Sequence, residues 1–252
     1  MRRLSDTTWP EVDRPASGGR VLVVPVGATE QHGPHLPLTT DTEIAVAVAE
    51  AAARRDPRLV VAPAVAYGSS GEHEGFPGTL SIGQDATETV LVELGRSAAR
   101  SFTHTVLACT HGGNAGPLAR ALGRLAAEGH PVTGWSPRWG GDLHAGRTET
   151  SLMLAIAPDR VRPGPWEPGG RQDGRELLPL LRAGGVRPVS PNGVLGDPRE
   201  ADPAEGVRLL DAAAAELVAF AAKLSAGPVT TGVVHRGGRT TRTVGTGGGD
   251  RP

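Results

Sequence analysis

The sequence predicts an α/β domain, a three-layer α/β/α sandwich with a mostly parallel central sheet. Short, continuously apolar runs, such as residues 21–26, alternate with longer helical stretches, such as residues 42–55. Strands that are apolar at every position are typical of a parallel sheet that helices cover on both faces. Polar, glycine-rich loops follow these apolar runs, as is typical where ligands bind outside the carboxyl ends of the strands.

Four strands and five helices are expected. The strands are predicted from short apolar runs at residues 21–26, 59–65, 105–109 and 132–135. The helices are predicted from apolar residues at helical spacing over residues 42–55, 85–99, 114–128, 148–156 and 211–225. Asn114 is expected to cap the third of these helices, because asparagine is a preferred N-cap residue.

A chain of 252 residues fits one large domain, which we place at residues 20–225. Residues 1–19 are then an N-terminal extension. Residues 160–206 are rich in Pro, Gly and Arg, which indicates long surface connections. The segment 226–252 has much Gly, Thr and Arg and few large apolar residues, which predicts a disordered tail.

Composition excludes several classes of function. A net charge of −1 gives no basic surface for nucleic acid, and no apolar run is long enough to span a membrane. The N-terminal residues lack the apolar core of a signal peptide, so a cytoplasmic protein is expected. One cysteine excludes a disulfide framework. Lys223 is the only lysine and lies in a helical pattern, which argues against a P-loop or a Schiff base.

Three polar clusters follow predicted strands. Glu30 and His32 come after the first strand and are two residues apart, so in an extended chain they project to the same side. Asp41 lies just before the next helix. His111 follows the third strand, and a glycine-rich loop that enters a helix carries two further candidates, His144 and Glu149. These six side chains are expected to meet at one edge of the sheet.

Imidazole and carboxylate ligands together suit zinc, iron or manganese better than magnesium or calcium. A carboxylate that can bridge, flanked by histidine and glutamate, is how a two-metal hydrolytic centre is assembled. The sequence has neither a G-x-S-x-G nucleophile elbow nor an H-E-x-x-H pair. We therefore expect two divalent ions, zinc and/or iron(II), with manganese as a further candidate.

Simpler roles compete for several of these residues. Asp41 could be a helix N-cap, and Glu149 could merely favour the helix dipole. His35, between prolines, is expected to pack a loop, and Cys109 to be a small core residue at a strand end. His104 has no acidic or glycine-rich company and is expected at the surface.

Four segments resemble the signatures of the creatininase family: GATEQHGPHLPLTTD, EHEGFPGTLSI, HGGN and HAGRTETSLMLAI. The resemblance covers roughly residues 20–215. It implies an α/β/α fold, a homo-oligomer, a dinuclear metal centre and hydrolysis of unusual C–N amide bonds. Mapped by motif, Glu30 and His111 would bind one metal, His32 the other, and Asp41 would bridge them. His144 matches the family's acid–base histidine.

The sequence departs from the family at two places. Creatininase has a further glutamate two residues after the histidine of the HGGN segment, where this chain has Gly113. Glu149 is our candidate for the missing ligand. The family usually has Asn-Gly directly before HGGN, where this chain has Cys109 and Thr110.

Three longer stretches resemble the branch of the family that serves the mycofactocin system: VAPAVAYGSSGEHEGFPGTLSIG, HAGRTETS and SPNGVLGDPREADPAEGVRLL. This resemblance implies a modified precursor peptide as substrate, cut at a Gly–Val bond. The product would be the Val-Tyr-derived dipeptide in the form of an aminopyrrolidinone. Glu72, His73 and Trp139 are expected to contact the substrate.

Other readings remain open on the sequence. An amidohydrolase of a small cyclic amide such as creatinine, or of a ribosylaminopyrimidine formamide, would use the same ligands. An unrelated housekeeping peptidase is a further alternative. A metal-binding scaffold without activity would be expected to have lost at least one ligand.

Overall fold

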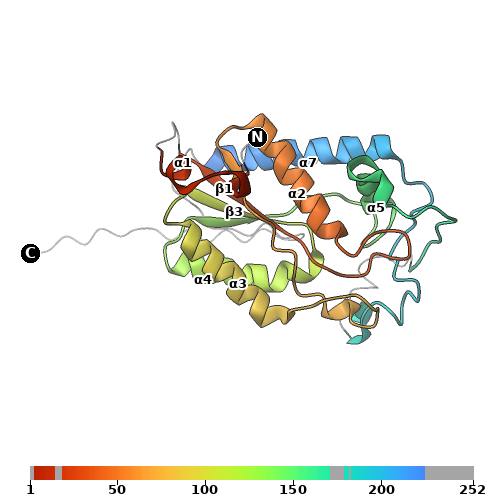
Figure 1. Ribbon diagram of the computed structural model, residues 1–252. Coiled ribbons are helices and arrows are strands. Elements are labelled where there is room, and N and C mark those ends of the chain that lie inside the picture. Colours follow the sequence, from red (N-terminus) through yellow and green to blue (C-terminus); the bar gives the residue numbers. More distant parts are fainter. Residues whose placement is uncertain (1–2, 15–18, 171–178, 182, 225–252) are drawn as a thin grey trace, which may run out of the picture.

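The computed structural model describes residues 3–14, 19–170, 179–181 and 183–224, so the tail expected over residues 226–252 lies outside the described residues (Figure 1). The sheet contains four parallel strands in the order β2-β1-β3-β4. Their bounds are β1 (Val21–Val26), β2 (Leu59–Val61), β3 (His104–Cys109) and β4 (Val132–Trp135). The predicted parallel α/β class is therefore confirmed.

Helices cover both faces of this sheet (Figure 1). One face carries α2 (Thr40–Arg55), α5 (Arg147–Ile156) and α7 (Pro203–Leu224), which pack against one another. The other face carries α3 (Gly83–Ala98) and α4 (Ala115–Ala127). Short helical turns complete the described elements: η1 (Leu4–Asp6), α1 (Trp9–Asp13), η2 (Gly71–His73), η3 (Gly112–Asn114) and η4 (Pro158–Arg160).

The apolar core consists of two clusters, one on each side of the sheet. Successive residues of β1 point to opposite faces, so Val21 and Val23 join the cluster under α2, α5 and α7. Leu22 and Val24 join the cluster under α3 and α4. Because both faces are covered, every residue of β1 is buried, which explains why its sequence is continuously apolar.

Several element boundaries differ from those expected, and the differences in α2, β2 and α7 have clear structural reasons. Helix α2 begins at Thr40, so Asp41 lies inside its first turn and the N-cap position belongs to Thr39. Strand β2 ends at Val61, because the chain beyond it returns to β1 only through an isolated bridge at Val65. Helix α7 begins at Pro203, earlier than expected, and a proline at a helix start is favoured since its missing N–H has no partner to lose there.

The described part of the N-terminal extension packs against the domain. Leu4 and Val12 contact the apolar cluster beneath α3 and α4. Thr8 and Glu11 form a capping box at the start of α1, which satisfies two backbone donors. None of the helices described in the structure is long and apolar enough to cross a membrane.

The strand order determines where a ligand can bind. After β1 the chain passes through α2 to β2 on one side, and β3 then pairs with β1 on the other side. The carboxyl ends of β1 and β3 lie in register, with Val26 opposite Cys109. In an open α/β sheet this reversal of direction creates a crevice between the two strand ends. The segments that carry Glu30 and His111 both leave the sheet there.

Candidate metal centre

The segment after β1 supplies two side chains that are completely buried, Glu30 and His32. The backbone N–H of Glu30 donates to the carbonyl of Leu38 at 2.9 Å, which fixes the turn between β1 and α2. The Nδ1 of His32 lies 3.1 Å from the backbone carbonyl of Glu30 and donates to it. The other ring nitrogen, Nε2, is therefore the atom that His32 presents to the site.

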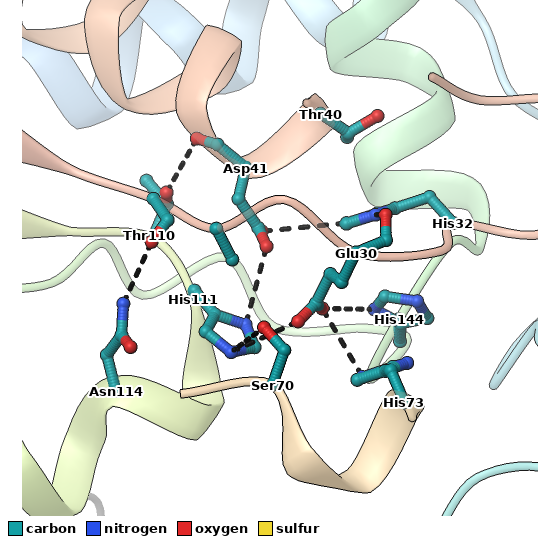
Figure 2. A network of polar contacts seen from close by, with 12 residues as sticks. Glu30, His32, Thr40, Asp41, Ser70, His73, Thr110, His111, Asn114 and His144 are labelled. Carbon is teal, nitrogen blue, oxygen red and sulfur yellow. Dashed lines mark hydrogen bonds and ion pairs between the residues drawn. The ribbon is translucent and has the colours of Figure 1, made fainter. Parts of the chain in front are cut away.

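Asp41 lies between two imidazoles (Figure 2). Its Oδ1 is 3.6 Å from Nε2 of His32, and its Oδ2 is 3.3 Å from Nδ1 of His111. The hydroxyl of Thr110 donates to the backbone carbonyl of Asp41 at 2.8 Å, so the end of β3 is tied to the first turn of α2. Thr110, a departure from the family pattern, thus holds Asp41, the residue expected to bridge the two metals.

Glu30 faces three imidazoles. Its Oε2 lies 3.2 Å from Nε2 of His111, and its Oε1 lies 3.3 Å from Nε2 of His73 and 3.7 Å from Nδ1 of His144. The rings of His73 and His144 are 4.4 Å apart, centre to centre. His73, which we expected to contact substrate, therefore also contacts a candidate metal ligand.

The loop that enters α5 brings His144 and Glu149 to the centre. Oε2 of Glu149 lies 3.8 Å from Nε2 of His32 and accepts a hydrogen bond from the backbone N–H of Ala145 at 2.6 Å. Ala145 has a φ of 51°, the only positive value at a non-glycine residue in the described chain. Such a conformation costs energy and is retained where the surrounding structure enforces it, here between two site residues.

The surroundings of Gly113 leave no room for the further glutamate that the family resemblance implies at this position. A Cβ atom there would lie 2.3 Å from the backbone carbonyl oxygen of Ser69 and 2.5 Å from Oε1 of Glu72. No side chain fits without movement of the backbone. Glu149 approaches the centre from α5 instead, next to His32.

The residues present fit a pair of metal ions. Four buried side-chain atoms in the centre have no hydrogen-bond partner in the described chain: both carboxylate oxygens of Glu30, Nε2 of His32 and Oδ2 of Asp41. Three sets of side chains place their ligand atoms within 4.8 Å of one another: Glu30 with Asp41 and His111, His32 with His144 and Glu149, and Glu30 with His73 and His144. Nitrogen and oxygen donors of this kind suit zinc, iron and manganese.

Burial and mutual interaction shift the pKa values of the proposed ligands. Burial raises the pKa of Glu30 to about 7, although His111 opposes the shift. Burial alone would lower the pKa of His32, but the charges of Asp41 and Glu149 raise it to about 10. Burial would raise the pKa of Asp41, but His32 and His111 hold it below its ordinary value. Without a metal, a protonated His32 supplies the positive charge that the buried carboxylates require.

The pKa values of the other two histidines move in the opposite direction. Burial, together with the charge on His111, lowers the pKa of His73 to about 3. Burial and the charge on His32 bring the pKa of His144 well below its ordinary value. Both imidazoles are therefore neutral near pH 7, so each has one N–H and one bare nitrogen.

A cavity of about 930 Å³ opens onto Glu30, His111 and His144, and its walls include Glu72 and His73. Trp139 does not line it. Trp139 instead lines a separate hollow of about 170 Å³, which also reaches His144 and Glu149. Two of the three expected substrate contacts thus lie in the large cavity and the third lies beside it.

The structure confirms some of the simpler roles expected for individual residues and contradicts others. His35 is buried and bonds Thr150 at 2.9 Å, and Cys109 is a buried core residue whose pKa burial raises to about 12. Both expectations are confirmed. The surface position expected for His104 is wrong, because it is 5% exposed within β3. Asn114 makes no capping hydrogen bond.

Asn114 and Gln31 are residues that the sequence reasoning missed. The amide of Asn114 accepts from the N–H of Ser69 and donates to the carbonyl of Gly27, both at 2.9 Å, so it ties the loop before η2 to the end of β1. Gln31 is buried between the two candidate ligands Glu30 and His32. The sequence signal that could have indicated Gln31 is its position, because it is a polar residue between two candidate ligands.

Comparison with known proteins gives the family. The family model described as creatinine amidohydrolase, or creatininase, matches residues 5–221. The chain belongs to the creatininase family. A mycofactocin precursor peptide peptidase of Mycobacterium tuberculosis is 50% identical over 202 residues, 76% of this chain and 80% of that protein. The corresponding protein of Mycolicibacterium smegmatis is 52% identical over 196 residues, 75% and 79% of the two chains.

A creatinine amidohydrolase of Pseudomonas putida is 35% identical over 200 residues, 63% of this chain and 73% of that protein. These relatives confirm the expected family and the expected reaction class, hydrolysis of an amide bond. A solved creatininase variant has a TM-score of 0.74 and 26% identity, and the match covers 89% of this chain and 99% of that one. Similar solved creatininases include a Zn–Zn form and a form with manganese.

Proposed function

We propose that this chain is a metal-dependent peptidase that releases the modified Val-Tyr dipeptide, as an aminopyrrolidinone, from a mycofactocin precursor peptide. The observation that carries the proposal is 50–52% identity to two peptidases of that name across three quarters of the chain. All the candidate ligands predicted from the sequence lie in or beside one buried centre, and this centre opens into a cavity.

The proposed centre holds two divalent ions, zinc and/or iron(II), or manganese. Glu30 and His111 would hold one ion, His32 and Glu149 the other, and Asp41 would bridge the two. Such a pair, when bound, polarises the scissile carbonyl and makes a water molecule more acidic. The donor set supports this assignment, because it combines carboxylates and imidazoles and leaves buried atoms without hydrogen bonds.

His144 is the proposed acid–base residue. It faces the cavity, and its neutral imidazole has a nitrogen that can accept a proton. As the attacking water forms the new C–O bond, His144 takes its proton. It then returns that proton to the leaving nitrogen as the C–N bond breaks. The step needs no covalent nucleophile, in keeping with the buried and protonated Cys109.

Glu72, His73 and Trp139 are proposed to contact the substrate. Glu72 and His73 line the large cavity, where the residues on either side of the scissile bond would lie. Trp139, in the adjacent hollow, offers an aromatic surface to the hydroxyphenyl group of the product. A homo-oligomer in the cytoplasm is also proposed from the family resemblance, and light scattering after gel filtration measures its size.

The test is a mass-spectrometric assay of the metal-loaded protein with the modified precursor peptide. We expect release of the cross-linked fragment, and no release once a chelator has removed the metal. The unmodified peptide, creatinine and a ribosylaminopyrimidine formamide serve as comparison substrates. Turnover of creatinine or the formamide without cleavage of the peptide would overturn the proposed substrate and leave the metal centre in place.

A further inference from the structure

The side-chain amide of Gln31 has a fixed orientation. Its Oε1 lies 2.9 Å from the backbone N–H of Gly33, which can only donate. Its Nε2 lies 3.0 Å from the backbone carbonyl of Gly193, which can only accept. A flip of the amide would lose both hydrogen bonds, and at 5% exposure water could not replace them. One N–H of the amide is thus directed to Gly193, and the other is free for a histidine.

Two imidazole nitrogens lie near that remaining N–H. Nδ1 of His73 is 2.9 Å from Nε2 of Gln31, and Nε2 of His144 is 3.0 Å from it. The second nitrogen is also 2.7 Å from the backbone carbonyl of Gln31, which can only accept. Nε2 of His144 must therefore be protonated and donate to that carbonyl. The amide N–H is left to His73, whose Nδ1 must be bare to accept it.

The opposite nitrogens of the two rings face Glu30. Nε2 of His73, the protonated one, lies 3.3 Å from Oε1 of Glu30. Nδ1 of His144, the bare one, lies 3.7 Å from the same oxygen. One ring thus presents a hydrogen-bond donor to the site and the other presents an acceptor, although both carry their proton on Nε2.

We propose that Gln31 is a positioning residue that, by its backbone carbonyl and side-chain amide together, sets which nitrogen of His73 and of His144 faces the reaction. His73 thereby presents a protonated Nε2 toward Glu30, and Nδ1 of His144 is the atom that exchanges a proton with the substrate. The proton exchange between Nδ1 of His144 and the substrate rests on the proposed function. The tautomers of His73 and His144 do not rest on it.

Gln31 also couples the site to the loop at residues 190–195. Gly193 has a φ of 81°, and a Cβ there would lie 1.9 Å from Oε1 of Gln31, so only glycine allows the loop to approach this closely. Leu195 in the same loop forms backbone hydrogen bonds with His144. The loop therefore holds both the amide and one of the histidines that the amide orients.

The experiment measures the tautomers directly. Full-length, zinc-loaded protein with ¹⁵N-labelled histidine is studied by long-range ¹H–¹⁵N correlation, because protonated and bare ring nitrogens differ strongly in chemical shift. Variants at His73 and His144 assign the signals. In the unaltered chain we expect a protonated Nε2 and an unprotonated Nδ1 on both rings. A bare Nε2 on His144 would overturn the proposal.

Two substitutions separate positioning from a merely structural role. Gln31→Glu replaces the amide N–H by a carboxylate oxygen, which can only accept a hydrogen bond. The proton of His73 should therefore move from Nε2 to Nδ1, while the proton of His144 should stay on Nε2. Gln31→Met removes the amide at similar volume, and we expect mixed His73 tautomers with zinc content retained. Loss of a residue that orients the side chains of a metal centre typically lowers metal affinity or activity by about 10–100-fold. Here we expect the decrease in kcat, with KM unchanged. An unchanged His73 in Gln31→Glu would contradict the proposal.

Ser190→Ala is the matched control. The Ser190 hydroxyl donates to the carbonyl of Val194 at 2.6 Å, so its loss loosens the same loop without touching either histidine. We expect unchanged histidine signals. A tautomer change in this variant would assign the effect to the loop and overturn the role of the amide. The expected tautomers in a protein that cleaves no peptide would refute the proposed function and the proton exchange with its substrate, and would leave the role of Gln31 in setting the two tautomers standing.

Discussion

The two faces of the sheet are built alike but perform different tasks. On one face, α2 and α5 direct acidic residues of their first turns, Asp41 and Glu149, into the buried centre. On the other face, α3 also has an acid in its first turn, Asp85, but that side chain is fully exposed. The ion pairs of α3 and α4, such as Arg96 with Glu128, lie at the surface, where such pairs contribute little.

The difference shows that the strand-to-helix pattern alone does not create a site. A first-turn carboxylate reaches the buried centre where its helix begins beside the crevice between β1 and β3. There the carboxylate meets histidines that leave both strands. The face with α3 and α4 supplies apolar packing, and the face with α2, α5 and α7 supplies both packing and candidate ligands.

The largest effect is expected for Asp41→Ala, because Asp41 contacts His32 and His111 and is the proposed bridging residue. The variant should bind neither metal. Its activity should fall by far more than the roughly 10–100-fold that is typical when a residue that only orients the metal ligands is replaced. Elemental analysis and the peptide assay measure both. Asp85→Ala, the first-turn acid of the opposite face, is the control and should keep metal and activity. Full activity in Asp41→Ala would remove the distinction between the faces.

His144→Ala should have the next largest effect. The neutral imidazole of His144 is the proposed proton carrier, so turnover should fall by about 10²–10⁴-fold, the usual contribution of acid–base catalysis. Metal content should be retained, since other side chains are the proposed ligands. His130→Ala, outside the centre, is the matched control. If the His144 variant lost metal, His144 would be a ligand, as two of the possible ligand sets allow.

Leu125→Ala tests the face whose helices α3 and α4 carry no candidate ligand. Leu125 is completely buried in the cluster beneath α3 and α4, and truncation of such a leucine leaves a cavity. We expect the free energy of unfolding to fall by about 2–5 kcal/mol in urea titrations. Metal content and kcat at low temperature should stay unchanged. A selective loss of metal would show that the two faces are coupled.

The smallest effect concerns pH. The pKa of His32 is raised to about 10, so the metal-free protein holds a proton there below that pH, and a metal must displace it. Metal affinity should therefore rise with pH up to about 10, by at most about tenfold per unit for each proton displaced. Calorimetry in buffers of different ionisation enthalpy measures the proton release. Binding without proton release would contradict the raised pKa.

The sequence predicted the parts of the molecule that depend on local pattern. Strand β1 is bounded as expected, because six consecutive apolar residues have no alternative to burial on both faces. Glu30, His32, Asp41, His111 and His144 were found since each stands near the end of a strand or the start of a helix. All of them are buried in the structure.

What the sequence could not predict depends on contacts between distant segments. The amide of Gln31 meets residues 73, 144 and 193, and no local pattern encodes that meeting. Asn114 has the residue type of a helix cap, but its amide is used to join Ser69 and Gly27. The positive φ of Ala145 arises from a turn that the side chain does not favour.

The crowded space at Gly113 restricts how this branch of the family can change. A substitution there would bring a Cβ within 2.3 Å of the backbone carbonyl of Ser69 and within 2.5 Å of the Glu72 carboxylate. A glutamate does not fit at this position by a single substitution, because the loop at Ser69 and the side chain of Glu72 would have to move with it. A rearrangement of the site that placed a ligand at residue 113 would therefore need several replacements at once, so the effects of substitutions at these three positions depend on one another.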